Sequence, residues 1–143
     1  MAELLVWTEE YSVGVAEMDK QHKEFIRLGN NVLEYAKTCT SGTLNAAELL
    51  AVINRLGNYA LYHLGSEEEY FTKFACEHID HHLYAHEQFR KTLKDFMVRY
   101  ADGSEDRCRL AEAIASFCVT WLLTHILSVD KGYTACFHKN GKY

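Results

Sequence analysis

The chain has 143 residues, which is the length of one ordinary domain with a substantial core. Hydrophobic residues make up 48% and charged residues 24%, a balance typical of globular proteins, so we do not expect a disordered chain. The net charge of -5 leaves no basic surface for nucleic acid or anionic lipid, and we expect no membrane span.

Residues 1–18 are predicted to form an N-terminal arm that contains Trp7. The arm starts with an acidic and only briefly apolar stretch, which does not resemble a secretion signal. A first helix is predicted over residues 19–38, where His22 shares one face with Phe25 and further apolar residues. The CTSGT segment then interrupts the helical pattern.

A second helix is predicted over residues 45–74. Asn45 is a suitable N-cap, and Glu48 follows three residues later, as in a capping box. The apolar residues of this segment recur alternately four and three positions apart. The same stripe passes through His63 and Glu67, where the pattern itself would require leucine. A helix with an imidazole and a carboxylate on its core face needs a chemical reason for them.

Two more helices are predicted over residues 80–101 and 105–128, separated by the ADGS turn. The stripe of the third helix begins with His82 and His86, which are one turn apart, and continues through aromatic and aliphatic residues. The buried line of the fourth helix ends at His125. The remaining residues form a short C-terminal tail.

Four helices of this length joined by short turns predict an all-α fold. We expect an up-down-up-down antiparallel four-helix bundle with an N-terminal arm and a short tail, in a single domain that spans residues 1–143. No strand pattern of useful length competes with this prediction.

Every predicted helix carries histidine on its core face. Unpaired imidazoles and carboxylates cost several kcal/mol each when they are buried, whereas a domain has a total stability of about 5–15 kcal/mol. A bound metal compensates this cost, because imidazoles donate to it and carboxylates neutralise it. The core polar residues that point to a metal site are His22, His63, Glu67, His82, His86 and His125.

The donor set of imidazoles and carboxylates leaves iron, zinc, copper and manganese open. A single tetrahedral zinc ion would use about four ligands, fewer than the core offers, and a carboxylate can bridge two ions. Two ions therefore fit better than one. The paired Glu-x-x-His motifs of ferritin-type carboxylate sites are missing, so the predicted site is rich in histidine.

Four short segments carry this pattern: DKQHKEF, HLGSE, HLYAH and HILSVD. Their order and spacing resemble those of the hemerythrin family, and most closely its single-domain bacterial form. The longer segments WLLTHILSVDKGY and VWTEEYSVGVAEMDKQH resemble the C-terminal signature and the N-terminal arm of that family. The likeness extends over essentially the whole chain.

The resemblance implies a non-haem di-iron centre that binds dioxygen reversibly, in an oxygen carrier, store or delivery protein that is not an enzyme. The implied ligands of the first iron are His82, His86 and His125. The implied ligands of the second iron are His22 and His63, which leave one coordination position open for dioxygen.

The resemblance also implies that Glu67 and Asp130 bridge the two irons, together with an oxo or hydroxo group. Spacing alone would favour an exposed helix-end position for Asp130. Five residues after His125, a regular helix has turned well past its buried face. Asp130 reaches inward only if the helix loosens at this end.

Three residues are predicted to wall an oxygen pocket and exclude water from it: Leu64, Trp121 and Leu122. Ordinary core packing is a compatible interpretation of the same residues. The resemblance places Tyr133 over the centre. It also implies a phenylalanine where this chain has Leu64, so this leucine and the neighbouring Gly65 predict a looser pocket.

The remaining histidines and the cysteines are expected to be structural. We predict that His78, His81 and His138 lie on the surface. The five cysteines form no CxxC pair and cannot all pair within one chain, so we expect reduced thiols, mostly buried, in a cytoplasmic protein.

Two other functions use the same predicted centre. An open di-iron site could reduce peroxide or nitric oxide, although no further acid or base is recognisable beside the pocket. Alternatively, the chain could sense oxygen or redox state and report it to a separate partner, since no output domain follows the last predicted ligand. For an oxygen carrier the expected partners are an oxygen-using enzyme or a reductant, and we expect a monomer.

Overall fold

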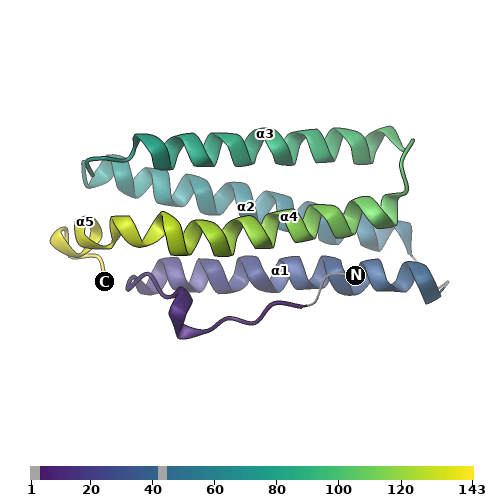
Figure 1. Ribbon diagram of the computed structural model, residues 1–143, viewed down its shortest axis with the longest axis horizontal. Helices are drawn as coiled ribbons and strands as arrows, with labels where there is room; N and C mark the ends of the chain where they lie inside the picture. The colour runs from purple at the N-terminus through teal and green to yellow at the C-terminus, as the bar shows by residue number, and fades with distance from the viewer. Residues whose placement is uncertain (1–3, 42–44) are drawn as a thin grey trace.

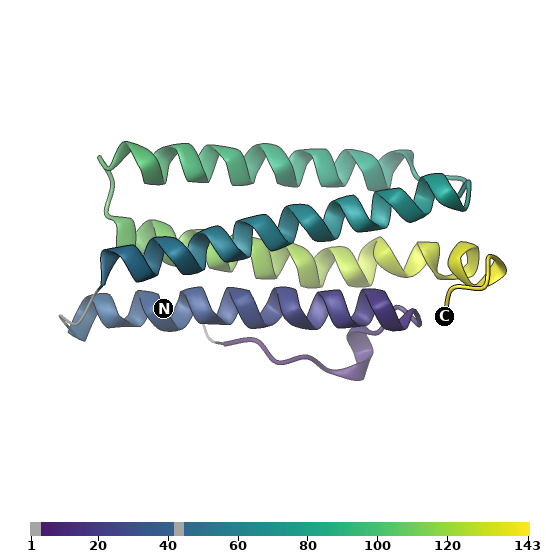
Figure 2. The ribbon, with the colours of Figure 1, turned by 180° about the vertical axis from the view of Figure 1, so that it is seen from behind.

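The computed structural model describes residues 4–41 and 45–143. Four long helices lie side by side and alternate in direction, and the part of the chain that the structure describes contains no strand (Figures 1 and 2). The helices are α1 (Ala16–Ser41), α2 (Ala46–Lys73), α3 (Asp80–Asp102) and α4 (Arg107–Ser128). The predicted all-α four-helix bundle is confirmed.

Three shorter elements complete the described chain: the 3-10 helices η1 (Glu9–Tyr11) and η2 (Asp130–Tyr133), and the helix α5 (Thr134–Lys139). The arm runs along the outside of α1, and α5 lies at the end of the bundle where α2 turns into α3 (Figure 1). The predicted tail is thus largely helical. This segment is ordered because Tyr133 and Phe137 are buried against the bundle.

The first helix begins at Ala16, earlier than the predicted start at Asp19. The Asp19 carboxylate accepts hydrogen bonds from the Ser12 hydroxyl at 2.5 Å and from the backbone N–H of Val13 at 2.9 Å. It therefore anchors the arm where the arm enters the helix. The helix also continues to Ser41, into the predicted CTSGT break, whose last residues, 42 and 43, lie outside the described part of the chain.

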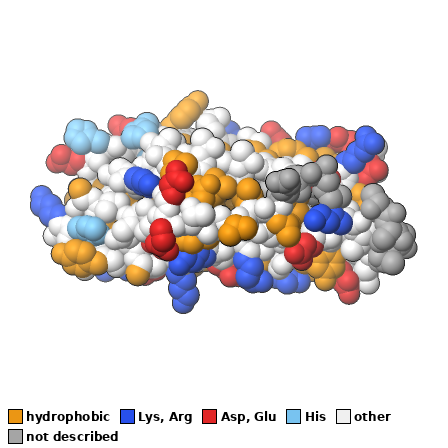
Figure 3. All heavy atoms as spheres, turned by 60° about the horizontal axis from the view of Figure 1, so that its bottom comes forward, with side chains coloured by type: hydrophobic (Ala, Val, Ile, Leu, Met, Phe, Trp, Pro, Cys, Tyr) orange, Lys and Arg blue, Asp and Glu red, His pale blue; other side chains and the backbone are white. Residues whose placement is uncertain are grey.

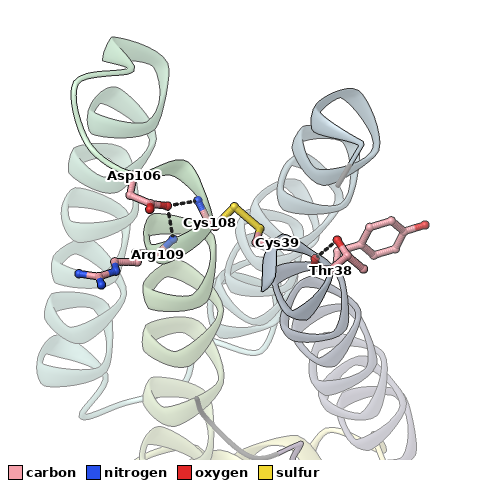
Figure 4. The surroundings of a disulfide bond; sticks show 6 residues. Thr38, Cys39, Asp106, Cys108 and Arg109 are labelled. Atoms are coloured by element: carbon pink, nitrogen blue, oxygen red, sulfur yellow. Dashed lines mark hydrogen bonds between the residues drawn. A yellow bond between two sulfur atoms is a disulfide. The ribbon is translucent and has the colours of Figure 1, made fainter. Parts of the chain in front are cut away.

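Helices α2 and α4 start with a side-chain cap, whereas α3 starts at Asp80 after Ile79, which makes no side-chain cap bond. The Asn45 side chain accepts a hydrogen bond from the Glu48 N–H at the start of α2. The Asp106 carboxylate accepts from the N–H groups of Cys108 and Arg109 at the start of α4 (Figure 4). Gly103 ends α3 with a φ of 78°, a conformation that glycine adopts without steric cost.

Helix α4 is long and apolar enough to cross a membrane, with a mean hydropathy of 1.6 over its most apolar window. Half of that window is buried inside the bundle, and the same helix places His125 in the core. The central helix of a globular bundle meets the same criteria, so α4 does not imply a membrane span. The face of the molecule shown in Figure 3 mixes acidic and basic side chains and presents no uniformly basic field.

The structure shows that the prediction of reduced thiols is wrong for four of the five cysteines. Cys39 at the end of α1 is bonded to Cys108 at the start of α4 (Figure 4), and Cys76 is bonded to Cys136 in α5. The partners are 69 and 60 residues apart, and only helix packing brings them together. Cys118 remains a buried free thiol, whose pKa burial raises to about 12. The cysteines therefore no longer support a cytoplasmic location.

Two mid-helix glycines are expected to respond oppositely to alanine. A β-carbon on Gly29 would lie 2.2 Å from Cγ2 of Val119, so Gly29→Ala forces α1 and α4 apart and should destabilise the protein by about 1–3 kcal/mol. A β-carbon on Gly65 meets nothing within 4 Å, so Gly65→Ala should stabilise it by about 0.5–1 kcal/mol. Urea unfolding of both variants measures the two changes. Equal shifts of the same sign would contradict the close approach at Gly29.

Candidate metal centre

The structure brings all seven predicted ligand residues together in the interior of the bundle. Each of the helices α1 to α4 contributes at least one of them, and η2 contributes the last. None of the seven is more than 5% exposed. They are His22 from α1, His63 and Glu67 from α2, His82 and His86 from α3, His125 from α4 and Asp130 from η2.

These side chains form two overlapping groups that share both carboxylates. In each group one ligand atom per residue lies within 4.8 Å of every other. The first group is Glu67, His82, His86, His125 and Asp130. The second group is His22, His63, Glu67 and Asp130. The chain thus offers three imidazoles on one side of the carboxylates and two on the other.

Asp130 presents a different oxygen to each group. Its Oδ1 lies 2.9 Å from Nε2 of His125 and 3.0 Å from Nε2 of His82. Its Oδ2 lies 3.2 Å from Nε2 of His22. A carboxylate whose two oxygens face two separate sets of imidazoles could bind two cations at once.

Glu67 lies between the same two groups. Its Oε1 is 3.2 Å from Nε2 of His86 and 3.6 Å from Nε2 of His63. Its Oε2 is 3.8 Å from Nε2 of His22. His63 and Glu67 lie on the core face of α2 because they belong to one polar cluster at the centre of the bundle.

Several buried polar atoms at the centre of this cluster lack hydrogen-bond partners. The Nε2 atoms of His22, His63 and His86 and both oxygens of Glu67 and of Asp130 are buried without a hydrogen bond to the described protein. Such atoms are costly to bury, and bound cations would satisfy all of them at once. The residues therefore fit a metal centre with imidazole and carboxylate ligands.

Asp130 reaches this cluster because α4 ends before it. The last α-helical residue is Ser128, and Val129 leaves the helical path with a φ of -128° and a ψ of -54°. Asp130 then starts the 3-10 helix η2 and is completely buried. The loosened helix end, which an inward-facing Asp130 requires, is present.

The charges of the cluster depend on one another. Burial alone would lower the pKa values of His22 and His82, but Asp130 and Glu67 outweigh it and raise both pKa values to about 9. Burial lowers the pKa of His63 to about 4. Burial would raise the pKa values of the two carboxyl groups, yet the surrounding imidazoles hold them well below the ordinary values. Both carboxylates are therefore ionised at neutral pH, as ligands of a cation must be.

Comparison with known proteins identifies this arrangement. Residues 13–136 match the model of the hemerythrin HHE cation-binding domain, and this range includes all seven residues of the cluster. The chain belongs to the hemerythrin family. The family model covers the bundle from the end of the arm to α5.

Proteins of this family match the chain over most of their own length. The bacteriohemerythrin of Clostridium acetobutylicum is 25% identical over 130 residues, which cover 91% of this chain and 98% of the relative. The bacteriohemerythrin of Methylococcus capsulatus is 26% identical over 134 residues, which cover 93% and 96%. A crystal structure of wild-type hemerythrin matches with a TM-score of 0.80 at 26% identity and covers 94% of this chain and 98% of its own.

Aromatic rings cover the hemerythrin cluster on its outer sides. Trp121 stacks on the ring of His125, with centroids 4.2 Å apart and planes inclined by 14°. Tyr133 stacks on His82 at 5.9 Å and 16°, as the resemblance implies. The Tyr133 hydroxyl is buried, and burial together with the nearby carboxylates raises its pKa well above the ordinary value. Tyr133 is thus a neutral side chain beside the carboxylates.

The residues predicted to wall the oxygen pocket differ in burial. Leu64 and Leu122 are completely buried, whereas Trp121 is partly exposed and shields His125 from solvent. Their role in an oxygen pocket stays a prediction. Gly65 lines a surface cleft with residues such as Tyr62, and a looser oxygen pocket also stays a prediction.

The N-terminal arm closes the cluster on the side of His22. Trp7 stacks on the His22 ring at a centroid distance of 6.5 Å, and the ammonium group of Lys23 lies over the Trp7 ring at 5.3 Å. The side-chain amide of Asn30 holds the arm in place by hydrogen bonds to the N–H and C=O groups of Leu5. The arm therefore contributes to the exclusion of water from the interior.

The other histidines lie outside the cluster. His78 and His81 are exposed beside the Cys76–Cys136 disulfide, as predicted. His138 is only partly exposed, because its ring lies 2.6 Å from the carbonyl oxygen of Gly14 and holds α5 against the arm. None of these three belongs to a metal-binding group of the described residues.

The sequence analysis did not identify three residues that surround the cluster: Gln21, Glu68 and Arg90. Gln21 contacts His63, and Glu68 contacts His86 and Arg90. Gln21 and Glu68 stand next to ligand residues along the chain, yet each hydrogen-bonds a ligand on a different helix. Helical periodicity describes one helix at a time, so it could not reveal these contacts.

Proposed function

We propose that the chain binds dioxygen reversibly at a non-haem di-iron centre and serves as an oxygen carrier, store or delivery protein. Oxygen binding is the role of the hemerythrin family. The observation that carries the proposal is the pair of carboxylates shared by a group of three imidazoles and a group of two, with buried carboxylate oxygens that have no hydrogen-bond partner. In this proposal His82, His86 and His125 hold one iron, and His22 and His63 hold the other.

The unequal number of imidazoles explains where dioxygen would bind. With both carboxylates shared, the two-histidine side offers one protein ligand fewer than the three-histidine side. Two iron ions in these positions would supply two electrons and an open coordination position to dioxygen. The protein side chains would hold the ions in the interior of the bundle and keep solvent away from them.

Water exclusion follows from the burial of the surrounding side chains. Phe25, which packs edge-on against the His63 ring at 6.1 Å, is completely buried, as are Leu64 and Leu122. A dry apolar interior disfavours the proton transfers and charge separation that would carry reduced oxygen away as a product. Release of bound dioxygen as the unchanged gas is therefore favoured.

The test is a metal assay coupled to visible spectra through cycles of deoxygenation. Iron-loaded, reduced protein should contain two irons per chain and develop a visible absorption band in air that disappears on degassing and returns with fresh air. Sustained consumption of a reductant with peroxide or nitric oxide would instead indicate an enzyme. Protein that folds normally but binds no stoichiometric iron would refute the proposal.

Shortening Leu122 is expected to accelerate autoxidation while both irons stay bound. The side chain is completely buried in α4, and its truncation opens space for water near the centre without removing a ligand. Leu127→Ala is the matched control, because Leu127 lies on the same helix and is 44% exposed. The decay of the oxygenated spectrum measures the rate. Equal rates in the two variants would argue against Leu122 as a pocket wall.

Metal affinity is expected to rise with pH up to about pH 9. The pKa values of about 9 mean that His22 and His82 are imidazolium ions at neutral pH. A metal must displace the additional proton of each ring. Two displaced protons predict an affinity gain of up to roughly a hundredfold per pH unit, and a plateau above pH 9. His63, with a pKa near 4, releases none. Cobalt(II) competition titrations between pH 6.5 and pH 9.5 check the slope, and a flat profile would contradict it.

A further inference from the structure

One imidazole in each half of the centre is hydrogen-bonded from behind, and the two partners differ in charge. Nδ1 of His63 lies 2.7 Å from Oε1 of Gln21, and Nδ1 of His86 lies 2.7 Å from Oε2 of Glu68. In both rings the opposite nitrogen, Nε2, faces the cluster. One imidazole thus has a neutral amide as its partner, and the other has a carboxylate.

The orientation of the Gln21 amide follows from its other contacts. Its Nε2 donates to the Ser66 hydroxyl at 3.0 Å and to the Glu17 carboxylate at 3.4 Å. The amide oxygen is therefore the atom that faces His63, and it can only accept. Nδ1 of His63 must carry the proton, which leaves its Nε2 with a lone pair directed at the cluster. Gln21 is 5% exposed, so this contact is shielded from water.

The Glu68 contact selects the same tautomer with a charged partner. A carboxylate can only accept, so Nδ1 of His86 donates and Nε2 is again free for a metal. The second oxygen of Glu68 accepts from Nη2 of Arg90 at 2.9 Å. This guanidinium group keeps Glu68 anionic and fixes its position. His86 is completely buried, whereas the Glu68 side chain is 27% exposed and approaches from the outside.

We propose that Glu68 is a positioning residue that makes the three-histidine half of the centre the more electron-rich half. A carboxylate acceptor draws the Nδ1 proton of His86 and increases the basicity of the opposite nitrogen. The neutral Gln21 does this much less for His63 on the other half. The proposal rests on the proposed di-iron function, since it concerns how the chain differentiates two metal positions.

The asymmetry has a consequence for the two metal positions. A more basic imidazole stabilises the higher charge of an oxidised metal, and outer hydrogen bonds are a recognised means by which proteins tune potentials. The three-histidine half, with Glu68 behind it, therefore favours the oxidised state. The two-histidine half, where dioxygen would bind, would be the harder of the two to oxidise.

Three variants separate charge from position. Glu68→Gln keeps an acceptor of nearly the same shape but removes the negative charge. Glu68→Leu removes the acceptor as well. Glu69→Gln is the matched control, because Glu69 is the next residue on α2, is exposed and loses the same charge away from the cluster. For each variant, cobalt(II) affinities are measured by competition, and the midpoint potential of the iron-loaded chain is measured by spectroelectrochemical titration.

We expect Glu68→Gln to raise the midpoint potential and to weaken the binding of one of the two metal ions by roughly 10–100-fold. Each tenfold change in a one-electron equilibrium corresponds to about 59 mV. Glu68→Leu should weaken that ion further, and Glu69→Gln should match the unaltered chain. If Glu68→Gln and Glu69→Gln share the same potential and affinities, the inference fails while the di-iron function stands. If the unaltered chain binds no pair of metal ions, both fail together.

Discussion

Replacing Asp130 with alanine is expected to abolish stable binding of both metal ions. Its two oxygens lie 2.9 Å and 3.2 Å from imidazoles of opposite halves, so the substitution removes a ligand from each position at once. The loss of affinity should exceed the roughly 10–100-fold that an outer-sphere substitution costs. Iron content after desalting, with the visible spectrum in air, measures the effect.

Asp102→Ala provides the control for this result. Asp102 is an exposed aspartate at the end of α3. Spacing alone would predict a similar exposed helix-end position for Asp130. We expect this variant to retain two irons per chain and the reversible band. An Asp130→Ala protein that also retained two irons would show that Asp130 is not a ligand and would remove the bridge from the proposed centre.

Removal of the Cys39–Cys108 disulfide is expected to lower the free energy of unfolding strongly. This bond joins the end of α1 to the start of α4 across 69 residues of sequence, so it restricts the unfolded chain strongly. The double variant Cys39→Ser with Cys108→Ser avoids unpaired thiols and should lower the free energy of unfolding by about 2–5 kcal/mol. Urea unfolding without reductant measures the change.

Cys118→Ala is the control for the disulfide experiment, because it alters the buried free thiol and leaves both bonds intact. It should cost clearly less than the double variant. Thiol titration of the denatured chain gives an independent check: one group should react without reductant and five with it. Five reactive groups without reductant would contradict both disulfides.

The second disulfide, Cys76–Cys136, lies close in the chain to residues of the candidate centre. Cys136 lies in α5, directly after the η2 segment that carries Asp130 and Tyr133, and its bond to Cys76 ties that segment to the connection between α2 and α3. Helix α2 itself carries His63 and Glu67. The bond therefore joins the two parts of the chain that supply Glu67 and Asp130.

Much of the fold and most of the cluster could be predicted from local patterns. A helix that packs in a bundle must repeat apolar residues every three or four positions, so the stripes through His63, His86 and His125 are visible without any structure. The caps at Asn45 and Asp106 are equally local, because a side chain bonds N–H groups two or three residues away. Polar residues on such stripes indicate a functional site, because burying them without partners costs free energy.

Other features depended on where the helices lie relative to one another. Asp130 faces inward only because α4 stops at Ser128, and the spacing from His125 by itself favoured the surface. Two mid-helix glycines look alike in the sequence, yet only Gly29 lies where another helix approaches closely. The prediction of reduced cysteines was wrong for the same reason, since the bonded pairs meet only when the helix ends are brought together.

By itself, the sequence determined which faces of which helices are buried, and therefore that five imidazoles and the Glu67 carboxylate lie in the core. Periodicity within a helix encodes this, because it follows from 3.6 residues per turn. Only the tertiary structure decided which side chains support the cluster from behind, which cysteines pair, and how Asp130 divides its oxygens between two groups of imidazoles. These depend on distances and rotations between helices, which no single helical pattern contains.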